Sequence, residues 1–78
     1  MEPIEVSAED RAMLENWFTY HPPTEDQREK YEEIHNWAHH LGMVICNAIP
    51  PCADRTAALR KLRECVWTAN DAIACGGK

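Results

Sequence analysis

The sequence predicts an all-α protein made of a short N-terminal helix and a long antiparallel helical hairpin. Apolar residues recur every three or four positions over two long stretches, which is the period of an amphipathic helix. The pairs Pro22–Pro23 and Pro50–Pro51 separate three segments, because proline ends a helix and biases the preceding residue toward extended geometry. At 78 residues the chain is expected to form a single domain, residues 1–78.

The first helix is expected over residues 8–17, after residues 1–6, which show no apolar period and should be extended. Ser7 is a favoured N-cap residue, and Glu9 and Asp10 in the first turn interact favourably with the helix dipole. The modest apolar side of this helix consists of Met13, Leu14 and Trp17.

The second helix is expected over residues 24–49. Thr24 and Gln27 have the spacing of a capping box. Gly42 interrupts the helix, at a cost of about 1 kcal/mol relative to alanine, or else it permits close approach of a neighbouring backbone. The apolar stripe consists of Tyr31, Ile34, Ala38, Leu41, Ile45 and Ala48, widened by Trp37 and Val44.

The third helix is expected over residues 53–75, with Gly76–Gly77 as its C-terminal stop. Its stripe is Leu59, Leu62, Val66, Ala69 and Ile73, with a second apolar row of Ala58, Cys65 and Ala72. Two helices of matched length joined by a tight Pro-Pro-Cys-Ala turn must lie antiparallel. One hairpin leaves a broad apolar face uncovered, which predicts a homo-oligomer.

Composition narrows the functional classes. With 13 acidic and 8 basic residues the net charge is −5, which argues against a DNA- or RNA-binding protein. The charge is uneven, however: residues 1–33 carry ten acidic and three basic residues, whereas residues 54–78 carry three acidic and five basic ones. A local anion site on the third helix is compatible with this distribution.

The compartment is predicted to be the cytoplasm. No apolar run approaches the roughly 18 residues of a membrane span, and no signal peptide is recognisable. Cys46 and Cys65 fall within helical apolar patterns, where a thiol behaves as a small hydrophobe. Together with Cys52 and Cys75 they are expected to remain reduced.

Evidence for a metal or catalytic site is weak. His35 and His39 share a helix face at a spacing able to hold zinc or copper, but no Cys-x-x-Cys pair supports such a site. The sequence shows no phosphate-binding loop, nucleophile motif or carboxylate within an apolar stretch. We therefore expect a non-enzymatic protein without metal or cofactor, and keep a metal-binding hairpin as the weakest alternative.

Polar residues on the third helix are candidates for a ligand site. The run Arg60-Lys61-Leu62-Arg63 either binds phosphate or forms a solvated helix face. Thr68 and Asn70 lie near the end of a largely apolar helix. Polar side chains there either bond across a subunit interface or contact a ligand.

Aromatic residues gather just before the second helix. Phe18, Tyr20 and His21 adjoin Pro22–Pro23 and either pack the bend between the first two helices or stack on a nucleobase. Beside a basic helix, such a set suits a small nucleotide better than a long nucleic acid.

An ordered series of motifs resembles a known family. The motifs are Phe18-x-Tyr20-His21-Pro22-Pro23, Gln27, Tyr31-x-x-Ile34, the Pro50 turn, Ala58-Leu59-x-Lys61-Leu62 and Ala69-Asn70-x-Ala72-Ile73-Ala74. Over about residues 17–75 the chain resembles the small helical-hairpin proteins of phages and prophages that sequester cyclic nucleotide signals, the anti-CBASS and anti-Thoeris sponges.

The resemblance implies a hexamer with ligand pockets between protomers, and non-catalytic binding of cyclic dinucleotides, cyclic trinucleotides or cyclic ADP-ribose-type signals in an infected bacterial cell. It implies that Tyr20 is the stacking ring and that His35 stands where the family holds a Lys or Arg that meets phosphate. Since imidazole is largely neutral near pH 7, phosphate binding through His35 should weaken as the pH rises. The chain also departs from the family pattern at Thr68, with Trp67 displaced by one position, and at Cys75.

Two main hypotheses of function remain at this point, beside the weaker metal-binding alternative. The first is a sponge whose predicted ligand-binding residues are Phe18, Tyr20, His21, His35, Asn36, Arg63, Thr68 and Asn70. The second is a structural or protein-interaction module that oligomerises through its helices, binds no small molecule and uses the aromatic residues as core.

Overall fold

The computed structural model describes residues 3–77, and every regular element in that range is an α-helix. The elements are α1 (Ala8–Phe18), α2 (Glu25–Ala48) and α3 (Ala53–Ala74). The predicted all-α class is confirmed. Of the N-terminal segment expected to be extended, residues 3–7 form no helix or strand, and residues 1–2 lie outside the described range.

The helix ends follow from their capping residues. Ser7 Oγ accepts a hydrogen bond from the Asp10 amide at 3.0 Å. Thr24 and Gln27 form the predicted capping box, with reciprocal bonds of 3.1 and 3.0 Å between side chain and backbone. Because Thr24 is the extended N-cap residue, α2 begins one residue later than expected.

The C-terminal ends are also shorter than expected by one residue. Ile49 is the extended C-cap of α2, and Cys75 is the C-cap of α3. Gly76 and Gly77 follow with φ angles of +68° and +77°, a region that L-residues with a Cβ rarely occupy. The glycine pair therefore ends α3, as the sequence predicts.

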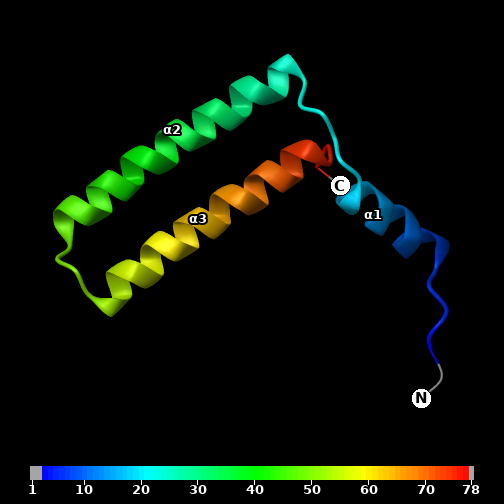
Figure 1. Cartoon of the computed structure of the whole chain (residues 1–78), viewed down its shortest axis with the longest axis horizontal. Coiled ribbons are helices and arrows are strands. Elements are labelled where there is room, and N and C mark those ends of the chain that lie inside the picture. The colour runs from blue at the N-terminus through cyan, green and yellow to red at the C-terminus, as the bar shows by residue number, and fades with distance from the viewer. Residues whose placement is uncertain (1–2, 78) are drawn as a thin grey trace.

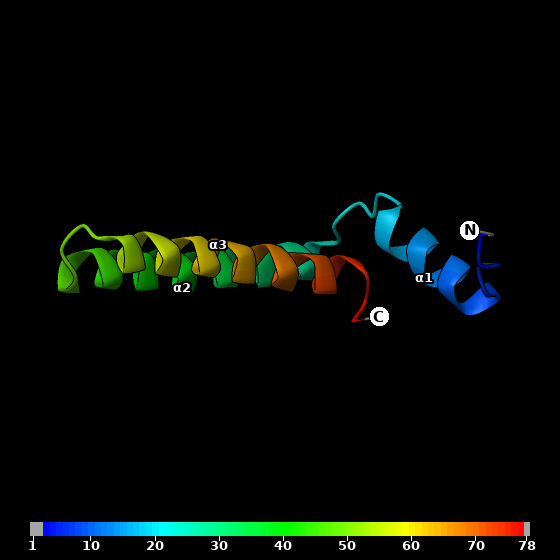
Figure 2. The same ribbon diagram turned by 90° about the horizontal axis from the view of Figure 1, so that it is seen from below.

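Helices α2 and α3 lie side by side and antiparallel, and together they form one flat layer (Figures 1 and 2). The chain measures 50 × 41 × 15 Å, and its radius of gyration of 17.3 Å exceeds the roughly 11.5 Å of a compact chain of this length. Among the described residues Val66 alone is buried, at 8% exposure. Such a hairpin has a seam but no enclosed core.

The seam contains most of the predicted apolar residues and one correction. Tyr31, Ile34, Ala38 and Ile45 are half-buried against α3, as are Leu59, Leu62, Ala69 and Ile73 on the other side. Leu41 and Ala48, predicted to belong to the same stripe, are instead exposed. Gly42 lies half-buried between them, because a stripe of period 3.6 drifts round a helix of 24 residues.

Gly42 does not serve a close backbone approach within the hairpin. A Cβ added there would meet Leu62 Cδ2 at 3.9 Å, which is an ordinary van der Waals distance. Within this chain, the remaining effect of Gly42 is its cost of about 1 kcal/mol in helix propensity relative to alanine.

Helix α1 lies beyond the open end of the hairpin (Figures 1 and 2). Asn16 Nδ2 donates to the Cys75 carbonyl at 3.3 Å, and Cys75 Sγ lies 3.8 Å from the Asn16 carbonyl. At the same end, Gln27 Nε2 donates to the Ile73 carbonyl at 3.1 Å. These contacts hold the end of α1 and its aromatic residues beside the end of α3.

The structure also bears on two sequence-based predictions, that the cysteines are reduced and that no segment spans a membrane. All four cysteines are free thiols. None of the helices in residues 3–77 is long and apolar enough to cross a membrane.

Candidate ligand site

An aromatic pocket lies between the end of α1 and the last turns of α3. Its volume is about 570 Å³, and its lining residues are Trp17, Phe18, Thr68, Asp71, Ala72 and Cys75. Trp17 is 48% exposed and Phe18 is 80% exposed, so both rings present large apolar areas. Small side chains on α3 leave room for a planar group beside them.

Apart from the Trp17 indole N–H and the weakly donating Cys75 thiol, the polar side chains that line the aromatic pocket offer hydrogen-bond acceptors. Thr68 Oγ1 donates its proton to the Glu64 carbonyl at 2.9 Å, which leaves the oxygen free only to accept. The Asp71 carboxylate is exposed and has no hydrogen bond or ion pair among the described residues. A carboxylate repels phosphate, so this pocket favours a neutral ring that donates hydrogen bonds.

A basic groove runs along the hairpin. Its volume is about 300 Å³, and its lining residues are His35, Ala38, His39, Leu59, Leu62, Arg63, Val66 and Trp67. The Arg63 guanidinium lies 4.5 Å from the centroid of the Trp67 ring, in cation–π contact. No acidic residue within positions 3–77 lines this groove, although the whole chain carries a net charge of −5. The groove is suited to an anion.

His35 and Asn70 are paired across the hairpin. Asn70 Nδ2 donates to His35 Nε2 at 3.2 Å, an arrangement that requires a neutral imidazole with its proton on Nδ1. Asn70 Oδ1 is buried and has no hydrogen-bond partner among the described residues. Turning the amide by half a rotation would let Oδ1 accept from a protonated His35. The pair therefore accommodates both charge states of the imidazole.

The remaining predicted residues lie outside these cavities. His21 Nε2 donates to the Asn16 carbonyl at 2.7 Å and so satisfies one of the last carbonyls of α1, which leaves Nδ1 for any ligand. Tyr20 is 81% exposed, and its ring is open to stacking. Asn36 is exposed on α2 and lines neither the aromatic pocket nor the basic groove.

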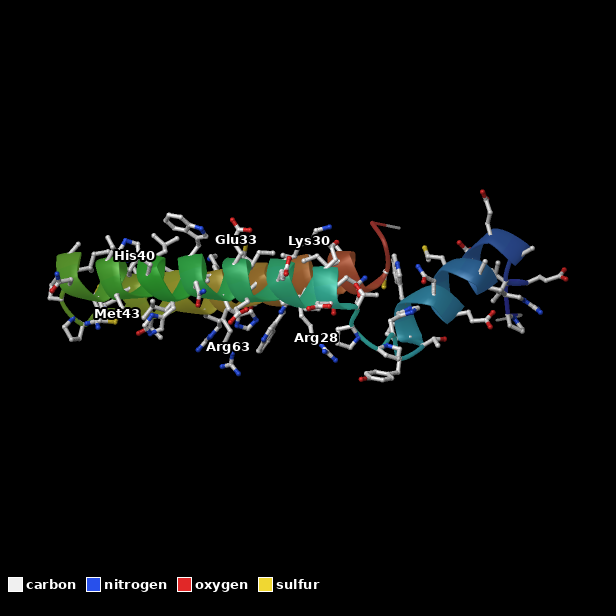
Figure 3. All side chains as sticks on the ribbon, turned by 90° about the horizontal axis from the view of Figure 1, so that it is seen from above. Arg28, Lys30, Glu33, His40, Met43 and Arg63 are labelled. Atoms are coloured by element: carbon white, nitrogen blue, oxygen red, sulfur yellow. The ribbon has the colours of Figure 1, made fainter. Side chains whose placement is uncertain are left out.

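An apolar groove occupies the other face of the hairpin. Its volume is about 320 Å³, and its lining residues are Glu33, Ile34, Trp37, Ala38, Leu41, Leu62, Cys65, Val66 and Ala69. Figure 3 shows Glu33, Lys30 and His40 on one side of the flat hairpin, and Arg63, Arg28 and Met43 on the opposite side. The apolar and basic grooves thus belong to opposite faces of one thin layer.

The predicted site residues therefore divide between two places. Phe18 and Thr68 meet in the aromatic pocket, whereas His35, Arg63 and Asn70 meet at or beside the basic groove. The ligand-binding set predicted from the sequence did not include four further lining residues: Trp17, His39, Trp67 and Asp71. Their helical spacing offered a signal, since Asp71 is one turn after Thr68, and Trp67 is one turn after Arg63.

His35 and His39, the pair considered for a metal ion, have no third metal ligand beside them in the described part of the chain. Within residues 3–77 no three His, Cys, Asp or Glu side chains gather in a way that could hold an ion.

Comparison with known proteins identifies the family. A family model described as the Acb2/Tad1 hairpin domain matches residues 10–74, which is 65 of the 78 residues. Neither the curated proteins nor the solved structures give a match. The matched segment contains nearly all of α1, the aromatic residues and both long helices. The chain belongs to the Acb2/Tad1 hairpin family, the anti-CBASS and anti-Thoeris sponges known for binding cyclic nucleotides.

Proposed function

We propose that this protein sequesters cyclic nucleotide immune signals without catalysis, in the cytoplasm of an infected bacterial cell. The ligands are cyclic dinucleotides, cyclic trinucleotides or cyclic ADP-ribose-type molecules, and their removal keeps the host's antiphage effectors inactive. The family match over residues 10–74 carries the proposal. The basic groove supports it independently, because it places Arg63 and two histidines together on an acidic chain.

Each proposed contact has a distinct chemical task. Tyr20 stacks on a base, and stacking of one base on a ring is worth about 1–3 kcal/mol. Arg63 grips a phosphate through its planar fork of N–H donors, since its stacking on Trp67 restricts its orientation. His35 adds a positive charge when it is protonated, and Asn70, turned so that Oδ1 accepts from His35 Nε2 in place of the 3.2 Å bond to the neutral ring, holds the imidazolium.

The proposed protein is a homo-oligomer, for which the hexamer is the expected form. The isolated chain exposes 6837 Å², whereas a compact protein of 9.0 kDa exposes about 4,900 Å². The excess of roughly 2,000 Å² per chain is within the range that stable interfaces bury. The apolar groove containing Trp37 and Leu41 is the face that we assign to a neighbouring protomer.

No turnover is needed for this activity. A protein present above the concentration of a signal holds the free signal near or below the Kd, so tight binding alone suppresses the effector. A helical interaction module without a small-molecule ligand would account for the apolar groove but would leave the basic groove without a purpose.

Isothermal titration calorimetry against a panel of cyclic dinucleotides, cyclic trinucleotides and cyclic ADP-ribose isomers tests the proposal. We expect at least one ligand to bind with a Kd below about 1 μM, which corresponds to about 8 kcal/mol. Tyr20→Ala should abolish that binding, whereas Tyr20→Phe, which keeps the ring, should retain most of it. A flat response to the whole panel would contradict the proposed function.

A further inference from the structure

We propose that the aromatic pocket is a base-reading subsite that selects guanine through Asp71. The inference rests on the proposed function, because it specifies which base of a cyclic nucleotide this protein prefers. It depends on the described residues that line the pocket, on what their polar atoms can donate or accept, and on the negative charge of Asp71 among them.

The shape of the pocket suits a planar ring. Trp17 and Phe18 supply two exposed rings from α1, while Thr68, Ala72 and Cys75 form a surface of small side chains on α3. The bonds between Asn16 and Cys75 hold the two helix ends together, so the pocket is formed before a ligand arrives. A volume of about 570 Å³ is ample for a purine.

The polar groups on the α3 side of the pocket favour a ligand that donates hydrogen bonds, while the Trp17 indole N–H is a donor on the α1 side. The Asp71 carboxylate can only accept hydrogen bonds, and the Thr68 hydroxyl already donates its proton to the Glu64 carbonyl. The Cys75 thiol, a weak donor, faces the Asn16 carbonyl at 3.8 Å. Among the described residues that line the pocket none is Lys or Arg, and the Asp71 carboxylate repels the phosphates of a ligand.

Guanine is the base whose edge fits a free carboxylate. Its Watson–Crick edge presents two adjacent donors, N1–H and the N2 amino group, which can bond both oxygens of Asp71 at once. Adenine presents one amino donor beside the acceptor N1, which would face a carboxylate oxygen with no proton between them. Cytosine and uracil likewise offer a single donor next to an acceptor. The carboxylate therefore favours guanine by attraction and disfavours the other bases by repulsion.

Three probes and two variants test the inference. Calorimetric Kd values are measured for cyclic di-GMP, cyclic di-IMP, which lacks the N2 amino group, and cyclic di-AMP. The wild-type protein should bind them in that order, with at least tenfold between the first and the last. Asp71→Asn keeps the shape of the side chain but adds a donor, which matches adenine. This variant should lose at least tenfold for cyclic di-GMP and gain for cyclic di-AMP, which inverts the preference.

Asp54→Asn is the matched control, since it removes the same charge at the other end of α3. It should leave all three Kd values within twofold. Both variants should retain the helical circular dichroism of the wild type, because the Asp71 carboxylate makes no hydrogen bond or ion pair among the described residues, and its backbone bond to Cys75 is kept in Asp71→Asn. Equal binding of all three probes, unchanged in Asp71→Asn, would overturn the base-reading subsite while leaving the sponge function intact. Failure of the wild type to bind any cyclic nucleotide of the full panel would overturn both.

Discussion

Replacement of Trp37 by glutamate should dissociate the oligomer. Trp37 is 68% exposed in the isolated chain and lines the apolar groove. A tryptophan has an area of about 250 Å², so about 170 Å² of this side chain becomes available to a neighbour. At about 25 cal/mol per Å², complete burial of that area stabilises the interface by about 4 kcal/mol.

The expected loss of association free energy in Trp37→Glu is therefore large even when burial of Trp37 is incomplete. Burial of half the area corresponds to about 2 kcal/mol, or about 30-fold in the association constant for each contact. A buried glutamate adds a desolvation cost to this loss. Because the isolated chain buries little beyond Val66, we expect the dissociated variant also to lose helicity at low concentration.

Sedimentation velocity over a range of protein concentrations measures the effect. Met43→Glu is the matched control: Met43 is 60% exposed and lies on the opposite face, so it receives the same charge away from the apolar groove (Figure 3). Trp37→Glu should shift the protein to smaller species, and Met43→Glu should sediment as the wild type does. The interface assignment is wrong if Trp37→Glu keeps the wild-type mass at all concentrations, or if Met43→Glu dissociates it instead.

Three further predictions concern helix stability and ligand charge. Gly42→Ala should raise the free energy of unfolding by about 1 kcal/mol in thermal or urea unfolding, because alanine has the higher helix propensity and its methyl group meets Leu62 at an ordinary distance. A clear loss of stability would instead indicate that a neighbouring protomer packs against Gly42. Thr24→Ala should destabilise α2 by about 1 kcal/mol through loss of the capping box, and an unchanged midpoint in the same assay would contradict the role of that cap. His35→Lys should strengthen binding of the best ligand in calorimetry, because lysine brings a full positive charge to the groove that Arg63 also lines, and an unaltered Kd would exclude His35 from phosphate binding.

The fold was accessible to sequence reasoning because its determinants are local. Ser7, the Thr24–Gln27 box and the Gly76–Gly77 pair act within one turn of the residues that they cap, and each has the predicted geometry. The prediction that Leu41 belongs to the apolar stripe was wrong for a different reason. Whether a side chain at the edge of a stripe faces the seam or the solvent depends on the exact twist and length of the helix, which spacing alone does not fix.

The site was less accessible because its geometry is tertiary. Asn70 was singled out as a polar residue in an apolar helix, but its partnership with His35, 35 positions away, depends on the register of the hairpin. Asp71 appeared only as one of three acidic residues among residues 54–78. Asp71 becomes a candidate for ligand recognition in the folded chain, because the end of α1 lies beside the end of α3 and Trp17 and Phe18 line the same pocket.

The proposed function requires that the protein bind a cyclic nucleotide in an oligomer and leave it unchanged. Native mass spectrometry of the protein with a stoichiometric amount of its best ligand, followed by denaturation and mass analysis of the released molecule, tests both points in one experiment. We expect a hexamer that carries ligand and releases it intact. A monomer without ligand, or recovery of a linear or hydrolysed product, would contradict it.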